Sequence, residues 1–88
     1  MKTIYYFTAE WCPPCKTTRP IVEELNREQS TAKFQIIDVD DNSDLVKTFT
    51  VQSVPTFILF ENGIEVKRII GSQTREQLEE FISYEENI

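Results

Sequence analysis

Two adjacent prolines, Pro13 and Pro14, set the strongest local restriction on how this chain folds. Proline lacks a backbone N–H and has a fixed φ, so it disrupts the interior of strands and helices but is tolerated in the first turn of a helix. The preceding residues 3–7 are all β-branched or aromatic, which is typical of a strand buried on both faces. The sequence therefore predicts a strand that ends before Cys12 and a helix that starts at the prolines.

Hydrophobic spacing and turn residues predict the remaining elements. In chain order they are a helix from the prolines to about residue 28 with a bend at Pro20, a strand over 34–39, a short helix through 45–49, strands over 56–60 and 64–70, and a helix through 78–82. Asn62-Gly63 favours a tight hairpin, and the spacing of Thr74 and Gln77 is that of a capping box. The order βαβαββα implies a right-handed parallel crossover and then a hairpin on the same sheet, with helices on both faces. The expected class is α/β, with residues 1–88 as a single domain.

The composition excludes several classes of site. The 88 residues include two Cys and no His, and the net charge is −6. Two cysteines form neither a disulfide framework nor a four-ligand Cys/His zinc site. Without histidine, Ser-His-Asp and Cys-His mechanisms are impossible. The acidic balance argues against binding to a nucleic-acid backbone.

The chain shows no segment that suggests export or membrane insertion. Its N-terminus lacks the apolar core and cleavage site of a signal peptide, and no stretch approaches the ~20 apolar residues that span a bilayer. A cytoplasmic location is therefore expected, where thiols are kept reduced. In that compartment a close cysteine pair is more often catalytic or metal-binding than a structural bridge.

Cys12 and Cys15 stand at the predicted start of the first helix. The N–H groups of a first turn and the helix dipole stabilise a thiolate, which is the attacking species in disulfide exchange. Cys12, at the cap position, is expected to be the exposed nucleophile, and Cys15, one turn inside, the buried resolving thiol. The prolines leave only the amides of Cys15 and Lys16 near the Cys12 sulfur, but they also hold the dithiol rigid for ring closure. Which of these two effects dominates stays open.

The segment Glu10-Trp11-Cys12-Pro13-Pro14-Cys15-Lys16 resembles the active-site signature of the thioredoxin family, with Pro13 where most members have Gly. Further landmarks follow in the family's order: Pro20 resembles its helix-kinking proline, Val54-Pro55-Thr56 its cis-proline segment, Asn62-Gly63 its hairpin turn and Ile70-Gly71 the loop before its last helix. The resemblance implies a thioredoxin-like fold with a four-stranded mixed sheet and a cis peptide before Pro55.

The same resemblance implies a thiol–disulfide oxidoreductase that reduces protein disulfides. Cys12 would attack the substrate and Cys15 would resolve the mixed disulfide, with no cofactor or metal beyond the Cys12–Cys15 pair. The substrate-docking surface implied around the reactive sulfur consists of Trp11, Pro13, Pro14, Val54, Pro55, Gly71 and Ser72. Expected partners are disulfide-containing proteins and a thioredoxin reductase or equivalent dithiol donor, with no nucleic acid and no membrane, and a monomer is expected.

The chain departs from the thioredoxin pattern in three ways. The family's usual first strand and helix are missing, so the chain is closer in size to glutaredoxins. Tyr6 stands where thioredoxins have a buried Asp, and Ile36 where they have the accompanying Lys. The family's means of taking the proton from the resolving cysteine is therefore missing, which leaves a water molecule or the Tyr6 hydroxyl as substitutes.

Two other functions remain as alternatives. A glutathione-dependent, glutaredoxin-like reductase fits the small size and Val54-Pro55, but Gly71-Ser72 stands where glutaredoxins have Gly-Gly. A non-catalytic, thioredoxin-like binding subunit would not need the full Trp-Cys-x-x-Cys-Lys signature, which argues against binding as the only role.

Overall fold

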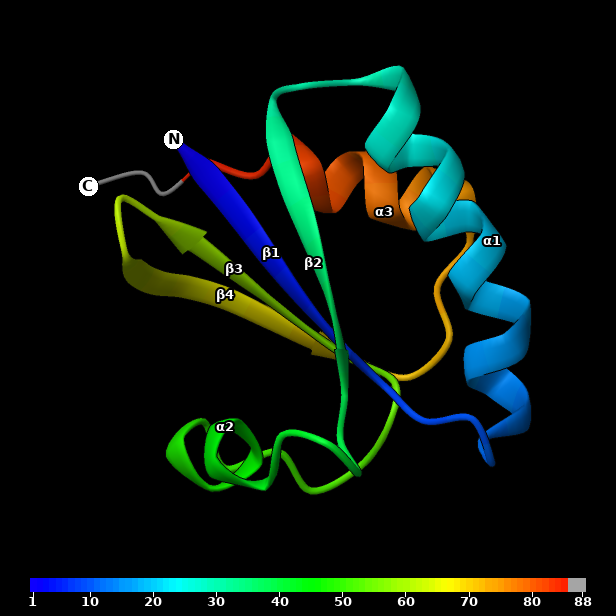
Figure 1. The fold of residues 1–88 in the computed structure, drawn as a ribbon. Coiled ribbons are helices and arrows are strands. Elements are labelled where there is room, and N and C mark those ends of the chain that lie inside the picture. The colour runs from blue at the N-terminus through cyan, green and yellow to red at the C-terminus, as the bar shows by residue number, and fades with distance from the viewer. Residues whose placement is uncertain (86–88) are drawn as a thin grey trace.

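Seven elements follow one another in the predicted order in the computed structural model, which describes residues 1–85 (Figure 1). The strands are β1 (Lys2–Thr8), β2 (Ala32–Asp38), β3 (Thr56–Glu61) and β4 (Ile64–Ile70). The helices are α1 (Pro13–Glu28), α2 (Ser43–Thr48) and α3 (Arg75–Ile82). Every predicted strand and helix is present, and residues 86–88 of the predicted domain lie outside the described residues.

The four strands form one mixed sheet in the order β2-β1-β3-β4. β1 and β2 are parallel, whereas β3 is antiparallel to β1 and β4 is antiparallel to β3. These pairings confirm a parallel crossover from β1 to β2 and a hairpin of β3 and β4 in the same sheet. Thr8 pairs with Asp38, so the carboxyl ends of β1 and β2 lie together. Loops that leave these two ends therefore meet at one edge of the sheet, and the first of them leads to the cysteines.

Helices cover both faces of the sheet, as expected: α1 and α3 lie on one face and α2 on the other (Figure 1). The α1–α3 face buries Ile4, Tyr6, Val22, Leu25, Phe57, Leu59, Leu78 and Phe81. The α2 face buries Phe7, Ile37, Ile58 and Phe60, with Leu45, Val46 and Phe49 of the helical segment packed on them. β1 contributes to both cores, which explains its continuous run of β-branched and aromatic residues.

Helix α1 begins as the prolines dictate. Cys12 is the N-cap residue with extended backbone, and the two prolines occupy the first helical positions, where a missing N–H breaks no helical hydrogen bond. The helix continues through Pro20 without interruption, and Pro20 is exposed, so the missing hydrogen bond falls on the solvent side. The bend predicted at Pro20 stays a prediction.

The two predicted turn motifs are also confirmed. Asn62 and Gly63 have φ values of 53° and 85°, the left-handed conformation that a two-residue hairpin requires. The Thr74 hydroxyl accepts a hydrogen bond from the Gln77 amide, and the Gln77 side chain accepts one from the Thr74 amide, which completes the capping box. Within residues 1–85, no helix combines the length and the apolar character needed to cross a membrane.

Candidate active site

The two cysteines lie at the amino end of α1, next to the carboxyl ends of β1 and β2. Both are free thiols. The Cys15 thiol donates to the Cys12 sulfur, and the two sulfur atoms are 2.6 Å apart. A disulfide bond is about 2.05 Å long, so the pair can close into a ring with little movement of the backbone.

Cys12 is more buried than the sequence suggested. Its exposed fraction is 3% and that of Cys15 is 1%, so the expectation of an exposed Cys12 is wrong for this structure. Ala9, Val39 and Val54 pack against the cysteine pair, and the Cys12 thiol donates to the Val54 carbonyl oxygen at 3.7 Å. Val39 and Val54 belong to segments distant in the chain, which is why the helix-start position alone did not predict the burial of Cys12.

The Val54–Pro55 peptide is cis, as the resemblance implied. The Gly71 amide donates to the Pro55 carbonyl oxygen at 2.8 Å, and Gly71 has a φ of 97° that glycine adopts without strain. The Val54–Pro55 segment therefore contacts Cys12 on one side and Gly71 on the other. The Pro55 side chain is fully buried, so it contributes no exposed surface to the predicted docking patch.

Trp11 and Val54 line the same groove. The Trp11 side chain is 64% exposed, and its indole Nε1 donates to the Asp40 carboxylate at 3.0 Å. The groove has a volume of about 180 Å³ and is lined by Trp11, Val39, Val46, Val51, Gln52, Ser53 and Val54. Pro13, Pro14 and Ser72 are exposed but do not belong to this lining.

Five of the groove residues were missed by sequence reasoning: Val39, Val46, Val51, Gln52 and Ser53. The apolar residues among them fall in the predicted strand over 34–39, in the predicted short helix or between the predicted elements. The parallel pairing of β1 with β2 was the available signal, because it brings the residues after Asp38 to the same edge as Trp11.

Tyr6 contacts the backbone of Cys15 from β1. Its hydroxyl donates to the Cys15 carbonyl oxygen at 3.1 Å, and its ring stacks on Phe57 with centroids 4.8 Å apart. Burial raises the pKa of the Tyr6 phenol above its ordinary value, so the group stays neutral. With its proton committed to a carbonyl, Tyr6 holds the backbone of Cys15 and is not the substitute base for its thiol.

The Cys15 thiol is held in its protonated form. Burial, the largest effect, raises the pKa of Cys15, and the hydrogen bond with Cys12 raises it further. Hydrogen bonding from the Thr8 side chain and the Ala9 backbone lowers the pKa of Cys15, but by less. Ile36 pairs with Tyr6 in the sheet register and brings no charge to this region.

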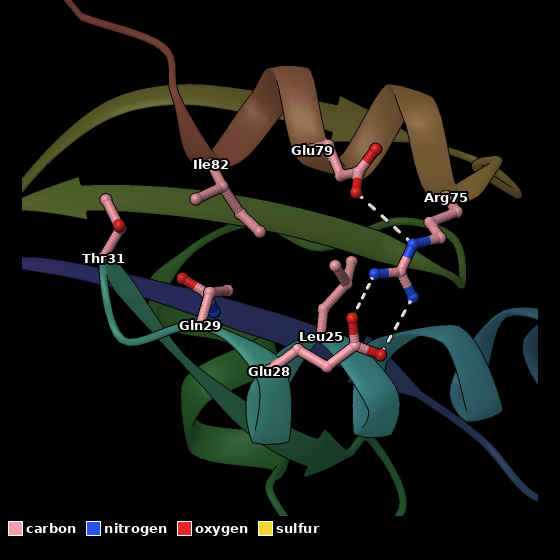
Figure 2. A pocket seen from close by; sticks show the side chains of 7 residues that line it. All are labelled: Leu25, Glu28, Gln29, Thr31, Arg75, Glu79 and Ile82. Carbon is pink, nitrogen blue, oxygen red and sulfur yellow. Dashed lines mark hydrogen bonds and ion pairs between the residues drawn. The ribbon is translucent and has the colours of Figure 1, made fainter.

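A separate cavity of about 320 Å³ lies between α1 and α3 and contains neither cysteine. Figure 2 shows Arg75 of α3 reaching to Glu28 of α1 and to Glu79 of its own helix. The pair with Glu28 joins the two helices, whereas the pair with Glu79 lies within α3. Among residues 1–85, no three cysteine or carboxylate side chains gather closely enough to hold a metal ion.

Comparison with known proteins places this site in context. The thioredoxin family model matches residues 1–84. The chain is 45% identical over 65 residues to thioredoxin of Mycoplasma genitalium, covering 74% of this chain and 64% of that protein. It is 42% identical over 77 residues to thioredoxin of Chlamydia pneumoniae, covering 88% of this chain and 76% of that protein.

Solved structures agree with the sequence comparisons. A mutant thioredoxin from Halobacterium salinarum superposes with a TM-score of 0.87 at 39% identity, covering 99% of this chain and 77% of the other. The Fasciola hepatica thioredoxin also has a TM-score of 0.87, at 34% identity, covering 93% of this chain and 78% of the other. The chain thus spans between 64% and 78% of the length of these four relatives.

Proposed function

The chain belongs to the thioredoxin family of thiol–disulfide oxidoreductases, and we propose that it reduces disulfides in protein substrates through Cys12 and Cys15. The observation that carries this proposal is the free thiol pair at the amino end of α1, with sulfur atoms 2.6 Å apart. The cis Val54–Pro55 segment beside Cys12 supports it, because its backbone can pair with an extended substrate segment.

The reaction proceeds in two exchanges. The Cys12 thiolate attacks one sulfur of the substrate disulfide, and the other substrate sulfur leaves as a thiolate and takes up a proton. The Cys15 thiolate then attacks the Cys12 sulfur of the mixed disulfide, which releases the second substrate thiolate. The substrate gains two electrons and two protons, and the protein is left with a Cys12–Cys15 disulfide. A thioredoxin reductase or an equivalent dithiol donor restores the two thiols, and no other cofactor takes part.

The groove from Trp11 to Val54 is the proposed docking surface. Its lining is mostly apolar, and the exposed ring of Trp11 offers a large contact area next to the buried sulfur. Pro13, Pro14, Gly71 and Ser72 extend this surface beyond the groove, and Pro55 holds its backbone in place. We propose that the chain works as a monomeric, single-domain electron carrier in the cytoplasm and so contributes to cell redox homeostasis.

Reduction of a disulfide-bonded protein, followed by the appearance of its free thiols, tests the proposal. Cys12→Ser abolishes activity, and Cys15→Ser accumulates a mixed disulfide with the substrate. Thr17→Ser, an exposed substitution in the same helix, serves as the matched control and retains full activity. Activity in Cys12→Ser equal to that of the native chain would contradict the assignment of the nucleophile.

The choice of reductant separates this function from the alternatives. Turnover supported by glutathione and glutathione reductase alone would favour the glutaredoxin-like reaction over the thioredoxin-like one. A Cys12→Ser/Cys15→Ser double variant that keeps the full cellular function would show that binding, and not thiol exchange, is what the cell requires.

A further inference from the structure

A small cavity adjoins Cys15 in addition to the docking groove. It has a volume of about 160 Å³ and is lined by Thr8, Ala9, Glu10, Cys15, Lys16 and Arg19. A water molecule occupies about 30 Å³ in the liquid, so the cavity has room for several. Glu10, Lys16 and Arg19 are exposed and form a polar rim, so water in the cavity has hydrogen-bond partners and a path to solvent.

Thr8 is the buried hydroxyl-bearing residue among those that line this cavity. It is the last residue of β1 and is 3% exposed. Its carbonyl oxygen accepts a hydrogen bond from the Val39 amide at 2.9 Å, and it pairs with Asp38 in the sheet, so its backbone is fixed. Thr8 therefore brings a hydroxyl-bearing side chain, on a fixed backbone, to the cavity that Cys15 also lines.

The resolving step has to deprotonate a thiol that its surroundings keep neutral. Burial and the contact with Cys12 both raise the pKa of Cys15. In the mixed disulfide the Cys12 sulfur is bonded to a substrate sulfur and is no longer a thiolate, so it cannot accept the Cys15 proton. Tyr6 donates to the Cys15 carbonyl oxygen and accepts no proton from the thiol. A different group must therefore favour the Cys15 thiolate.

We propose that the Thr8 hydroxyl activates Cys15 for resolution by donating a hydrogen bond to its thiolate, while water in the adjoining cavity takes up the thiol proton. This inference rests on the proposed disulfide reductase function, and its geometric basis is that Thr8 and Cys15 line the same cavity. The Ala9 backbone assists from the same strand end, since it also favours the thiolate. A hydrogen bond to an ionised group is stronger than one between neutral groups, so the Thr8 contact strengthens as the proton leaves.

The balance of the step follows from this arrangement. The Cys15 S–H bond breaks, its proton passes to cavity water, and the electron pair stays on the Cys15 sulfur. That sulfur forms the new bond to Cys12 Sγ as the bond from Cys12 to the substrate sulfur breaks. The substrate sulfur leaves with the electron pair of the broken bond and takes a proton from solvent.

The charged groups around the cavity modify this effect but do not replace it. Lys16 and Arg19 favour a thiolate at Cys15 and Glu10 disfavours it, and all three side chains are exposed. Water and salt therefore screen their fields. Cys12 and Tyr6 are the other ionisable groups near Cys15. Cys12 favours the neutral form of Cys15, whereas Tyr6 is itself neutral because burial raises its pKa.

Two substitutions at Thr8 test the proposal. Thr8→Val has nearly the same shape without the hydroxyl, and Thr8→Ser retains the hydroxyl. The reduced protein is mixed with a disulfide-bonded protein under single-turnover conditions, in separate reactions between pH 5 and pH 10. Each reaction is quenched with acid at a series of times, and the amount of mixed disulfide is measured by mass spectrometry. We expect Thr8→Val to slow the decay of the mixed disulfide about tenfold at neutral pH, to shift its pH profile upward and to match the native rate at alkaline pH. Thr8→Ser should behave as the native chain, and formation of the mixed disulfide should be unchanged in both variants.

Three results would overturn the proposal: a Thr8→Val profile equal to the native one, a slowing of the same size at every pH, or a Thr8→Ser variant as slow as Thr8→Val. Titration of the Cys15 thiol in the reduced protein is the second measurement, and its pKa should rise in Thr8→Val and not in Thr8→Ser. If Thr8→Val does not fold, Thr8→Ala removes the hydroxyl without adding bulk and takes its place. Failure of the proposed function would appear differently, as the lack of any mixed disulfide in Cys15→Ser, while the titration would still decide the role of Thr8.

Discussion

The Trp11 indole Nε1 donates a hydrogen bond of 3.0 Å to the carboxylate of Asp40, which lies 29 residues further along the chain. This contact joins the loop before α1 to the loop after β2 at the edge of the sheet where the cysteines lie. It holds an exposed aromatic ring in the lining of the proposed docking groove, so that little side-chain freedom would be lost when a substrate binds.

Removal of the Asp40 carboxylate should therefore weaken substrate docking. We expect Asp40→Ala to raise the KM for a protein disulfide several-fold and to leave kcat nearly unchanged. The free energy of unfolding should change by less than about 0.5 kcal/mol, because both side chains are exposed. Trp11 is the single tryptophan of the chain, so its fluorescence anisotropy reports directly whether the ring has been released. Asp40→Asn keeps an oxygen acceptor and is the matched control, and an unchanged KM with a freely rotating Trp11 would rule out this role.

Tyr6 supports the active site by structure and not by proton transfer. Tyr6→Phe removes the hydrogen bond to the Cys15 carbonyl oxygen and should lower the free energy of unfolding by about 1 kcal/mol. The pH profile of mixed-disulfide resolution should stay where it is, in contrast to Thr8→Val. Tyr5→Phe, in the adjacent position on the opposite face of β1, is the control for denaturant unfolding. A displacement of the Tyr6→Phe profile toward alkaline pH would show that the Tyr6 hydroxyl takes part in the deprotonation of Cys15.

Pro13 should influence the reduction potential through two effects. Loss of a thiolate donor and a rigid backbone oppose each other in the reactivity of Cys12, but both favour the disulfide over the dithiol and so act on the potential in the same direction. Pro13→Gly adds a first-turn N–H that can stabilise the Cys12 thiolate, and it loosens the backbone that must close the disulfide ring. Both changes favour the dithiol, so the potential should rise by roughly 10–30 mV, as measured by equilibration with a glutathione buffer. Thr17→Gly alters the same helix outside the ring and should leave the potential unchanged. A lower potential in Pro13→Gly would show that another effect of the prolines dominates.

The sequence predicted the features of this molecule that depend on short segments. The prolines placed the start of α1, the Asn62-Gly63 pair placed the hairpin, and the Thr74 and Gln77 spacing placed the last helix. Each of these depends on backbone chemistry within a few residues. The cis peptide before Pro55 came from the family resemblance, because local sequence alone does not select that isomer.

The burial of Cys12 could not be predicted in this way. Its cover comes from Val39 and Val54, which lie 27 and 42 residues away in the chain and meet Cys12 only through the sheet topology. The sequence predicted only part of the lining of the proposed docking groove for the same reason. Val46 has the spacing of a core residue of a short helix, and nothing local distinguishes a residue that lines a groove from one that is enclosed.

Thr50 adopts a backbone conformation that its side chain disfavours. It follows α2 with a φ of 52°, where a β-branched residue is strained by about 1–2 kcal/mol. Thr50→Gly relieves this strain, which exceeds the cost of the extra freedom that glycine gives the unfolded chain. The free energy of unfolding, measured by denaturant unfolding, should therefore rise by about 0.5–1 kcal/mol. Thr50→Ala keeps a Cβ and should gain much less, which makes it the matched control. A loss of stability in Thr50→Gly would mean that the Thr50 side chain makes a contact worth more than the strain.

The stability of the reduced protein should fall at alkaline pH because of Cys15. Its pKa is raised above the ordinary value of 9.0, chiefly by burial, so the unfolded chain loses this proton at a lower pH than the folded one. The stabilisation is therefore fully present below pH 9 and declines as the pH rises through the folded pKa, by at most about 1.4 kcal/mol per pH unit for one group. Tyr6, whose pKa is raised above 10.0 by burial, adds a second decline at higher pH.

Denaturant unfolding of the reduced protein between pH 7 and pH 11 measures this decline. Cys15→Ala should delay its onset to the range in which Tyr6 titrates, and the oxidised native protein should behave as Cys15→Ala does, because its Cys15 carries no proton. Equal slopes in the reduced and oxidised forms just above pH 9 would show that a group other than Cys15 is responsible. The comparison links the burial of the resolving thiol, which slows its ionisation during turnover, to a property measured without any substrate.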